Sequence, residues 1–423
     1  MAPVSKILLL VAVVLVVIFP FSLVREGIFS PGAAAAPSGR VRVIVVLRDD
    51  VVDPQRSAAS LAQQYRGAVS FVYEHALKGF AAEFPAQVVP VLARDSRVSY
   101  VEPDQVVYAF GELPTGVDRI EADQNNTAQI DGSDQRVNVD IAILDTGIAS
   151  HPDLNIAGGV NCTSGGILRP RCKSGGYADK NGHGTHVAGI AAARDNGSGV
   201  VGVAPGARLW AVKVLGDNGS GYLSWIIAGI DWVTNNASTI EVANMSLGCE
   251  CSSQSLDAAL NRSTDAGVVY VVAAGNSAKD ASTFSPANHP RVITVSAMAD
   301  FDGKAGGKAT PTCRSDAGAD DTFATFSNYG SVVDLAAPGV CIRSTVPGGY
   351  AVYSGTSMAS PHGAGAAALY IVEKGIARSS TRWSTVRDGL RSDWAVPQSD
   401  DCGFSGGDLN EPFLLLAACE VAP

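Results

Sequence analysis

The chain has 423 residues, a formal net charge of −10, and a composition that is 46% hydrophobic and 17% charged. This length predicts about two domains, and the apolar content is sufficient for a large core. The acidic balance and the lack of any nucleic-acid-binding motif argue against a nucleic-acid partner.

The first 36 residues have the composition of a targeting segment. Lys6 precedes an apolar run over residues 7–24, and four alanines ending at Ala36 supply small residues for signal cleavage. We therefore expect a signal peptide over residues 1–36 and a secreted, extracellular protein. The apolar run also approaches the length of a membrane-spanning helix, so a membrane anchor stays open as the alternative.

Residues 37–110 contain no cysteine and form a separate predicted unit. Residues 41–47 have the pattern of a strand, residues 57–65 that of a helix, and residues 73–84 that of one long strand or a pair. A second helix and a last strand over residues 98–107 follow. This order predicts a small ferredoxin-like α+β domain, with an unrelated small domain as the alternative.

Apolar strands alternate with helical segments after Gly111. The expected strands span residues 139–144, 209–214, 242–245, 268–273 and 292–295. Such alternation is typical of an α/β fold in which helices cover both faces of a largely parallel sheet, giving three layers. We assign no role to a Gly-rich insertion over residues 300–321, and we expect the tail after Arg378 to pack as a cap.

Three motifs in a fixed order place an acid, a base and a nucleophile along this part of the chain. Asp145 ends an apolar strand, while His183 and Ser357 each open a segment of small residues typical of a packed helix. Serine needs a base to act as a nucleophile at neutral pH, and a carboxylate orients that base. Ser357 is expected near a helix N-terminus because Pro361 fits a helix only in its first turn. Backbone N–H groups there favour a developing negative charge.

Other enzyme classes share fragments of these motifs. Aspartic peptidases use Asp-Thr-Gly, but they need two such carboxylates and only one Asp-Thr-Gly occurs here. The zinc-peptidase helix has its histidines four apart with a Glu between them, whereas His183 and His186 are three apart without one. Ser357 lacks the Gly-x-Ser-x-Gly elbow of α/β-hydrolases. His186 and His362 are interpreted as structural helix residues.

The order Asp, His, Ser is that of subtilisin, and the chain resembles the subtilisin-like serine peptidases from about Pro114 to beyond Ala368. The resemblance implies a subtilisin-like fold and activity. Ser357 would attack the scissile carbonyl, His183 would transfer the proton and Asp145 would orient His183. Asn276, in Val-Ala-Ala-Gly-Asn-Ser, matches the residue whose side chain donates to the oxyanion, together with the Ser357 backbone N–H.

Further segments resemble the walls of the substrate cleft. A peptide would add as a strand between two of them, and the pocket for the residue before the scissile bond would lie beside a third. These residues are Gly219, Ser220, Gly221, Ser246, Leu247, Gly248, Ala273, Ala274 and Gly275. The walls are small or apolar and uncharged, which favours large apolar or aromatic side chains, and Phe284 is expected near the base of the pocket.

By the same resemblance, residues 37–110 form an inhibitory pro-domain that acts as intramolecular chaperone and inhibitor. The self-processing junction would lie between Phe110 and Gly111. Residues 111–423 would form the catalytic domain with a disulfide-containing C-terminal extension. We expect a monomer whose partners are protein and peptide substrates.

The resemblance also implies structural calcium, which prefers carboxylate and carbonyl oxygens. The first expected site combines Asp153, the Asn196 side chain and three carbonyls; the second, of the proteinase K branch, combines Asp334 and two carbonyls. The carbonyls are those of Arg194, Ser198 and Val200 at the first site and of Pro290 and Val292 at the second. Solvated surface loops are the alternative at both places.

All eight cysteines follow residue 160, and an even number in an exported chain predicts disulfides. Local pairs between Cys162 and Cys172, between Cys313 and Cys341, and between Cys402 and Cys419 are plausible. Cys249 and Cys251 remain unassigned at this stage, since eight cysteines allow 105 connectivities.

The sequence therefore predicts a secreted serine endopeptidase made as a self-processed zymogen, with broad specificity. A catalytically inactive scaffold on the same fold is one alternative, although no triad or oxyanion residue is lost. A membrane-anchored convertase specific for basic residues is another, although Asp217 is the only acidic residue evident in the cleft segments.

Overall fold

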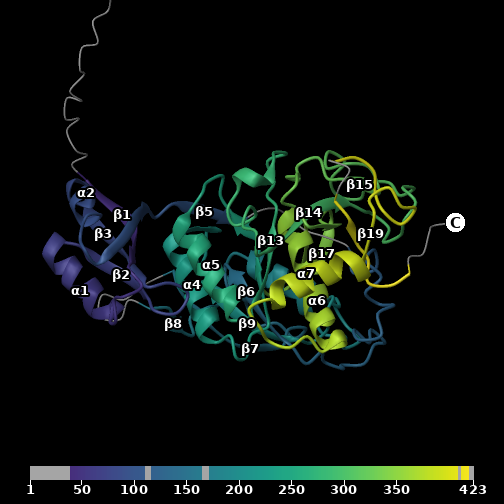
Figure 1. Ribbon diagram of the computed structural model, residues 1–423. Coiled ribbons are helices and arrows are strands. Elements are labelled where there is room, and N and C mark those ends of the chain that lie inside the picture. Colours follow the sequence, from purple (N-terminus) through teal and green to yellow (C-terminus); the bar gives the residue numbers. More distant parts are fainter. Residues whose placement is uncertain (1–38, 110–115, 164–170, 408–410, 419–423) are drawn as a thin grey trace, which may run out of the picture. The chain divides into compact units, whose positions relative to one another are not determined.

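The computed structural model describes residues 39–109, 116–163, 171–407 and 411–418 (Figure 1). The predicted signal peptide, the junction between Phe110 and Gly111, and Cys419 lie outside these residues. Within the described ranges, no helix is both long and apolar enough to cross a membrane.

The amino-terminal unit is a four-stranded antiparallel sheet in the order β2-β3-β1-β4 with its helices between the strands in sequence. Its elements are β1 (Arg40–Leu47), α1 (Pro54–Tyr65), β2 (Ala68–Tyr73), β3 (Gly79–Pro85), η1 (Ala86–Val88), α2 (Val89–Leu92) and β4 (Val98–Pro103). The predicted β-α-β-β-α-β order is confirmed. In the region predicted as one long strand or a pair, residues 73–84, only Tyr73 belongs to β2, and β3 begins at Gly79. Asp53 starts α1 by accepting from the N–H of Arg56 at 2.8 Å, and Pro54 occupies the first helical position, where no N–H is needed.

The remainder of the chain is built on an 11-stranded sheet. The strands, in spatial order, are β19 (Ala395–Val396), β20 (Phe413–Leu414), β16 (Leu335–Pro338), β14 (Ile293–Ala299), β13 (Val269–Ala273), β11 (Val242–Met245), β6 (Asp140–Asp145), β9 (Arg208–Lys213), β7 (Ile156–Asn161) and β8 (Lys173–Ser174), with β15 (Thr322–Phe323) paired to β14. Neighbours from β20 to β7 pair in parallel, as predicted. The C-terminal tail, which was expected to pack as a cap, extends this sheet through β19 and β20.

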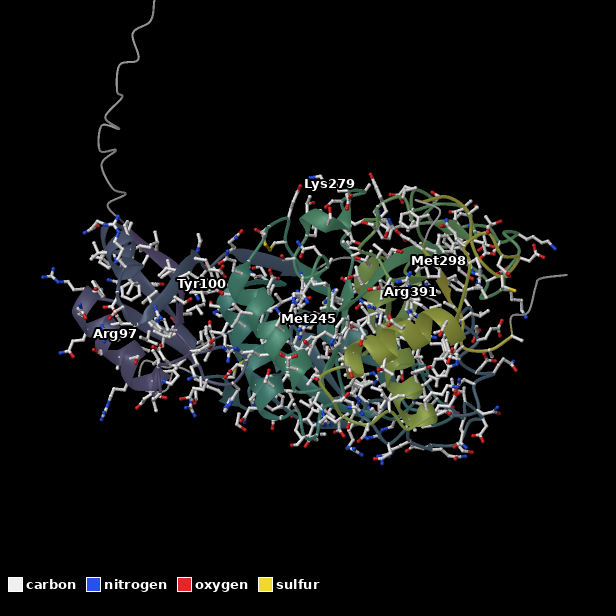
Figure 2. All side chains as sticks on the ribbon, in the orientation of Figure 1. Arg97, Tyr100, Met245, Lys279, Met298 and Arg391 are labelled. Atoms are coloured by element: carbon white, nitrogen blue, oxygen red, sulfur yellow. A yellow bond between two sulfur atoms is a disulfide. The ribbon has the colours of Figure 1, made fainter. Side chains whose placement is uncertain are left out.

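Helices cover both faces of the sheet (Figure 1). α3 (His183–Ala192), α6 (Thr356–Lys374) and α7 (Arg382–Asp393) share one core, and α4 (Leu223–Asn235) and α5 (Gln254–Asp265) share the other. Alternate residues of a strand serve the two cores, because side chains alternate across a sheet: Ile143 of β6 faces the first and Leu144 the second. Met298 and Met245, labelled in Figure 2, likewise fill the first and the second core.

α3 and α6 are buried over almost their whole lengths and pack against each other. A helix that is buried all round must carry small and apolar residues. A Cβ atom added at Gly365 of α6 would lie 2.5 Å from Val203 Cβ, so only glycine allows this close approach. The hairpin of β17 (Ile342–Val346) and β18 (Gly349–Tyr353) contacts α3.

The disulfides Cys162–Cys172 and Cys313–Cys341 are present, which confirms two of the expected pairs. Cys249 and Cys251 form a third disulfide across a single residue. Cys402 is also disulfide-bonded.

Candidate active site

Asp145 and His183 form a buried hydrogen-bonded pair. Asp145 is the last residue of β6 and His183 the first of α3, and the distance from His183 Nδ1 to Asp145 Oδ1 is 2.8 Å. The same oxygen accepts from the N–H of Thr146 at 2.6 Å. Since a carboxylate oxygen only accepts, Nδ1 carries a proton, and in the neutral form of the ring Nε2 is then the basic nitrogen.

Ser357 is the second residue of α6, and its hydroxyl lies 3.3 Å from the carbonyl oxygen of Ser246. Pro361 lies in the second turn of α6 rather than in the first, and it has no N–H to donate to the Ser357 carbonyl. The hydroxyl of Ser246 replaces this missing donor at 2.7 Å. Because Pro361 lacks this donor, the start of α6 is bonded instead to Ser246, in the segment that follows β11.

Asn276 is hydrogen-bonded to Thr356, the residue that precedes Ser357. The N–H and the hydroxyl of Thr356 donate to Asn276 Oδ1 at 2.8 and 2.9 Å, and the N–H of Gly275 donates to the Thr356 hydroxyl at 3.0 Å. Because a backbone N–H can only donate, the side-chain atom that faces it is the amide oxygen. The amide nitrogen of Asn276 is thereby left on the other side, where it can donate to an anion. The sequence reasoning missed Thr356, although it directly precedes the serine.

Asn328 holds the loop that carries Asn276, and sequence reasoning missed it too. It is fully buried; its Oδ1 accepts from the N–H groups of Ser277 and Lys279 at 3.0 and 3.1 Å, and its Nδ2 donates to the Ala274 carbonyl at 2.9 Å. A Cβ atom at Gly275 would lie 2.4 Å from Asn328 Nδ2, so this close packing requires glycine.

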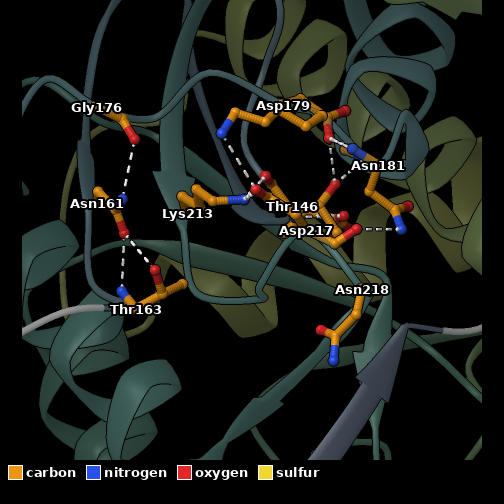
Figure 3. Close-up of polar contacts among 12 residues, drawn as sticks. Thr146, Asn161, Thr163, Gly176, Asp179, Asn181, Lys213, Asp217 and Asn218 are labelled. Atoms are coloured by element: carbon orange, nitrogen blue, oxygen red, sulfur yellow. Dashed lines mark hydrogen bonds and ion pairs between the residues drawn. The ribbon is translucent and has the colours of Figure 1, made fainter.

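Asp179 connects the segments that carry Asp145 and His183 (Figure 3). Its Oδ1 accepts from the Thr146 hydroxyl and from the N–H groups of Asn181 and Gly182, each at 2.9 Å. Its Oδ2 accepts from the N–H and hydroxyl of Thr185 at 2.9 and 2.6 Å. Asp179 is only 4% exposed, so its charge is stabilised by these donors. An acidic residue four positions before His183 was the available sequence signal.

Lys213 ties the same region to the loop before Gly219 (Figure 3). Its buried ammonium group donates to the Thr146 carbonyl and lies 3.0 Å from Asp217 Oδ1. Asn181 Nδ2 donates to the Asp217 carbonyl at 3.2 Å. The loop is therefore fixed to residues adjacent to both Asp145 and His183.

The two expected cleft walls flank a strand from the amino-terminal unit. β5 (Val106–Ala109) pairs antiparallel with β10 (Ser220–Tyr222) on one side and with β12 (Leu247–Gly248) on the other. Ala109 opposes Leu247, and the strand ends one residue before Phe110. The segments predicted to hold a peptide thus hold this chain's own residues 106–109.

Phe284 packs near the third predicted wall. It is 3% exposed, and its ring lies 3.5 Å from the position of a Cβ atom on Gly275. Cys249 and Ser285 exchange two backbone hydrogen bonds of 3.0 Å, which link the end of the Ser246–Gly248 wall to the residue after Phe284. Ala273 ends β13, and Ala274 continues it through an N–H bond to Val295 at 3.0 Å.

Two carboxylates, one at the end of β4 and one just after it, accept hydrogen bonds from backbone N–H groups in the first turns of α4 and α5. Asp104 accepts from the N–H of Ser224 at 2.6 Å, and Glu102 accepts from the N–H of Ser255 at 3.2 Å. Asp231 of α4 accepts in turn from three N–H groups of residues 74–76. Helix N-termini favour such negative charges. Burial raises the pKa of both Asp104 and Asp231, and hydrogen bonds oppose this shift.

At the first expected calcium site, the loop over residues 194–200 lies around Asp153. The carboxylate of Asp153 accepts from Asn196 Nδ2 at 3.1 Å, from the Val200 N–H at 3.2 Å and from the Tyr350 hydroxyl at 2.6 Å. The amide oxygen of Asn196 accepts from the Ser198 N–H at 3.1 Å. The Asp153 carboxylate and the Asn196 amide oxygen both lie here, and oxygen donors of this kind suit Ca²⁺.

The second expected calcium site does not fit a metal ion. Arg387 of α7 donates to the Pro290 carbonyl at 3.1 Å, and its Nε lies 3.8 Å from Asp334 Oδ1. The guanidinium groups of Arg387 and Arg391 face oxygens that were expected to bind calcium. This corrects the expectation of a calcium ion at Asp334, Pro290 and Val292.

A different acidic cluster lies in the insertion. Carboxylate oxygens of Asp300, Asp302 and Asp320 lie within 4.8 Å of one another and could hold a metal ion. The buried guanidinium of Arg119 pairs with Asp300 at 3.1 Å and with Asp321 at 2.8 Å. Burial, only partly offset by hydrogen bonding and by Arg119, raises the pKa of Asp300 to about 8. The Asp-x-Asp spacing at the start of the insertion was a sequence signal for this cluster.

Comparisons with known proteins identify the family of both parts of the chain. Residues 137–393 match the sequence model of the subtilase family, and residues 42–110 match that of peptidase inhibitor I9. Subtilisin NAT from Bacillus subtilis subsp. natto is 39% identical over 320 residues, which are 74% of each chain. An alkaline protease from Alkalihalobacillus alcalophilus is 37% identical over 339 residues, 79% of each chain. The crystal structure of a cold adapted subtilisin-like serine proteinase matches with a TM-score of 0.53 and 33% identity, covering 72% of this chain and 98% of that one.

Proposed function

Because the chain belongs to the subtilase family of serine peptidases, we propose that it is a secreted endopeptidase made as a self-processed zymogen. The observation that carries this proposal is the pairing of β5 between β10 and β12. A peptide bound in this mode is recognised mainly through its backbone. The residue that follows β5 in the chain is Phe110. Processing between Phe110 and Gly111 would leave residues 37–110 as inhibitor and chaperone.

The proposed reaction is acyl transfer to Ser357. The Ser357 hydroxyl attacks the scissile carbonyl carbon while His183 Nε2 takes its proton, and Asp145 stabilises the resulting imidazolium through Nδ1. Collapse of the tetrahedral intermediate breaks the C–N bond, and His183 returns the proton to the leaving amine. Water then attacks the acyl-enzyme by the same proton path, releasing the acid and restoring Ser357.

Asn276 would stabilise the oxyanion of each tetrahedral intermediate. The two donors of Thr356 fix its amide oxygen, which supports a preorganised Nδ2 donor. In subtilisin itself, loss of the asparagine donor lowers kcat by about 10²–10³.

We propose a preference for large apolar or aromatic residues before the scissile bond. Gly275, the Ser246–Gly248 wall and buried Phe284 offer no charge to such a residue. Burial of a Leu or Phe side chain contributes roughly 1.5–3 kcal/mol, whereas a Lys or Asp head group would lose its hydration without a partner. The value of kcat/KM over peptides that vary only at this position should favour Phe, Tyr, Leu and Met. A preference for Arg or Lys would support the convertase alternative instead.

We propose calcium binding at Asp153 and the loop over residues 194–200. Bound only to the folded state, the ion would stabilise the protein by roughly 2.7 kcal/mol at a hundredfold excess over Kd. A chelator should lower Tm, and Asp153→Ala should remove part of that response. Identical melting curves with and without chelator would rule out this calcium site and would not affect the peptidase assignment.

Active-site labelling tests the proposed function. A serine-directed phosphonyl fluoride should label the processed protein at Ser357 and abolish peptide cleavage, and Ser357→Ala should take up no label. An unlabelled wild-type protein that cleaves no peptide would support the inactive scaffold.

A further inference from the structure

Asp334 is fixed between two strands of the central sheet. It directly precedes β16, its N–H donates to the Thr294 carbonyl at 2.9 Å, and its Oδ2 accepts from the Thr294 N–H at 3.0 Å. Asp334 is only 8% exposed. Its second carboxylate oxygen, Oδ1, therefore needs a cationic partner, because a buried charge is costly unless it is paired.

Helix α7 supplies that partner. Arg387 Nε lies 3.8 Å and Arg391 Nη1 3.6 Å from Asp334 Oδ1. Arg387 Nη1 also donates to the Pro290 carbonyl at 3.1 Å. One guanidinium thus faces both the carboxylate and a carbonyl that the resemblance assigned to calcium.

The position of Arg387 is fixed by contacts within α7. Its guanidinium carbon lies 4.9 Å from the centre of the Trp383 ring, an arrangement that favours a cation, and its Nε lies 3.1 Å from Asp388 Oδ1. Val386 and Leu390 are fully buried on the core side of the helix. Arg387 and Arg391 are four residues apart, so they share one face of α7, and Arg391 is labelled in Figure 2.

A calcium ion and these arginines are alternatives. A divalent ion at Asp334 Oδ1 would stand beside two guanidinium groups, and the Pro290 carbonyl already accepts a hydrogen bond from one of them. A guanidinium has planar N–H donors that suit carboxylate and carbonyl oxygens, and it remains charged at every relevant pH.

We propose that Arg387, assisted by Arg391, is a built-in cation that replaces calcium at this place and pins α7 to the sheet. The attachment of α7 to the sheet at Asp334 is then independent of calcium, whether or not calcium binds at Asp153. This inference concerns stability, so it holds or fails independently of the proposed peptidase mechanism.

The test uses the full-length Ser357→Ala chain, which removes self-digestion from the measurement. Tm is measured in CaCl₂ and in chelator for this chain and for the same chain with Asp334→Asn. Asp334→Asn should lower Tm but leave the calcium-induced shift in Tm unchanged. A smaller calcium-induced shift in the Asp334→Asn chain would show that calcium binds at Asp334 and would overturn the proposal.

The reverse experiment removes the arginines. The Arg387→Ala, Arg391→Ala double variant should gain an additional calcium-induced shift in Tm, on the order of 5 °C at a hundredfold excess over Kd, and Asp334→Asn should abolish it. If the double variant does not fold, Arg387→Gln keeps a donor for the Pro290 carbonyl without the charge and should gain a smaller shift. Arg314→Ala, remote from Asp334 in sequence, is the control and should gain none. Failure of the folded arginine variants to gain an Asp334-dependent response would contradict the proposal.

Discussion

The hydroxyl of Ser246 donates to the carbonyl oxygen of Ser357 at 2.7 Å, at the position that Pro361 leaves without a helical donor. One residue of the cleft wall is thus bonded to the residue that carries the proposed nucleophile. The expected cleft wall and the first turn of α6 are therefore joined by this buried hydrogen bond, in addition to the contact of the Ser357 hydroxyl with the Ser246 carbonyl.

Ser246→Ala should destabilise the protein by about 1–3 kcal/mol, because it leaves a buried carbonyl without a donor. Pro361→Ala restores a helical N–H that can donate to the Ser357 carbonyl. In the Pro361→Ala background, Ser246→Ala should therefore cost clearly less. Urea unfolding measures this coupling in four chains that all carry Ser357→Ala: the parent, the Ser246→Ala variant, the Pro361→Ala variant and the variant with both changes. Equal costs of Ser246→Ala in both backgrounds would show that the two residues do not share this carbonyl.

Asp179→Asn should lower kcat on the order of 10-fold or more while KM changes little. The amide places an NH₂ group against N–H and O–H donors that now meet a carboxylate oxygen, so the segments holding Asp145 and His183 shift relative to each other. Steady-state kinetics on the processed enzyme measures both constants. The exposed Asp316→Asn is the matched control. A rise in KM at unchanged kcat would place the role of Asp179 in substrate binding.

Thr356→Val should lower kcat less than Asn276→Leu does, again at little change in KM. It removes one of the two donors to Asn276 Oδ1, while the backbone N–H remains. Asn276→Leu removes the proposed oxyanion donor and should cost about 10²–10³ in kcat, the loss known for subtilisin. Once Asn276→Leu is present, Thr356→Val should cost little more. Additive losses would mean that Thr356 acts independently of Asn276.

His362 should make folding stability depend on pH. It is fully buried in α6 with Nδ1 2.8 Å from the Met358 carbonyl, and burial lowers its pKa to about 4. The unfolded chain takes up a proton near pH 6.5 and the folded chain does not, so stability is lost as pH falls from about 6.5 towards 4. In this range one such group lowers the free energy of unfolding by about 1.4 kcal/mol for each pH unit that the pH falls.

His362→Gln should therefore reduce the loss of unfolding free energy between pH 6.5 and 5 by roughly 2 kcal/mol. Gln retains a donor for the Met358 carbonyl but does not titrate. The comparison is made by urea unfolding in the Ser357→Ala background. His186 also has a pKa lowered by burial, and His362 lowers it further, so the comparison reports His362 together with its effect on His186. Parallel pH curves for the two chains would refute a buried neutral His362.

Local patterns in the sequence predicted the placement of the three residues of the proposed triad. An apolar run before Asp145 and segments of small residues after His183 and Ser357 predicted a strand end and two helix starts, and these placements are confirmed. The order of elements in residues 40–103 is confirmed for the same reason. Two of the disulfides were among the local cysteine pairs that the sequence suggested.

Residues that act through distant contacts were not predictable. Asp179, Asn328 and Thr356 are polar residues whose roles depend on which backbone groups the fold brings to them. Arg387 has the appearance of a surface residue of an amphipathic helix, and only tertiary packing places it at Asp334. Resemblance to a family could suggest calcium there, but it could not reveal that this chain supplies its own cation.

Self-processing of the chain reports directly on the proposed activity of Ser357. Secreted wild-type protein and Ser357→Ala protein are purified from a host without extracellular peptidases, and their N-termini are sequenced. The wild-type protein should begin at Gly111, and the Ser357→Ala protein should begin near Pro37 and retain the amino-terminal unit. A Ser357→Ala protein that also begins at Gly111 would contradict the claim that this chain cleaves itself with Ser357.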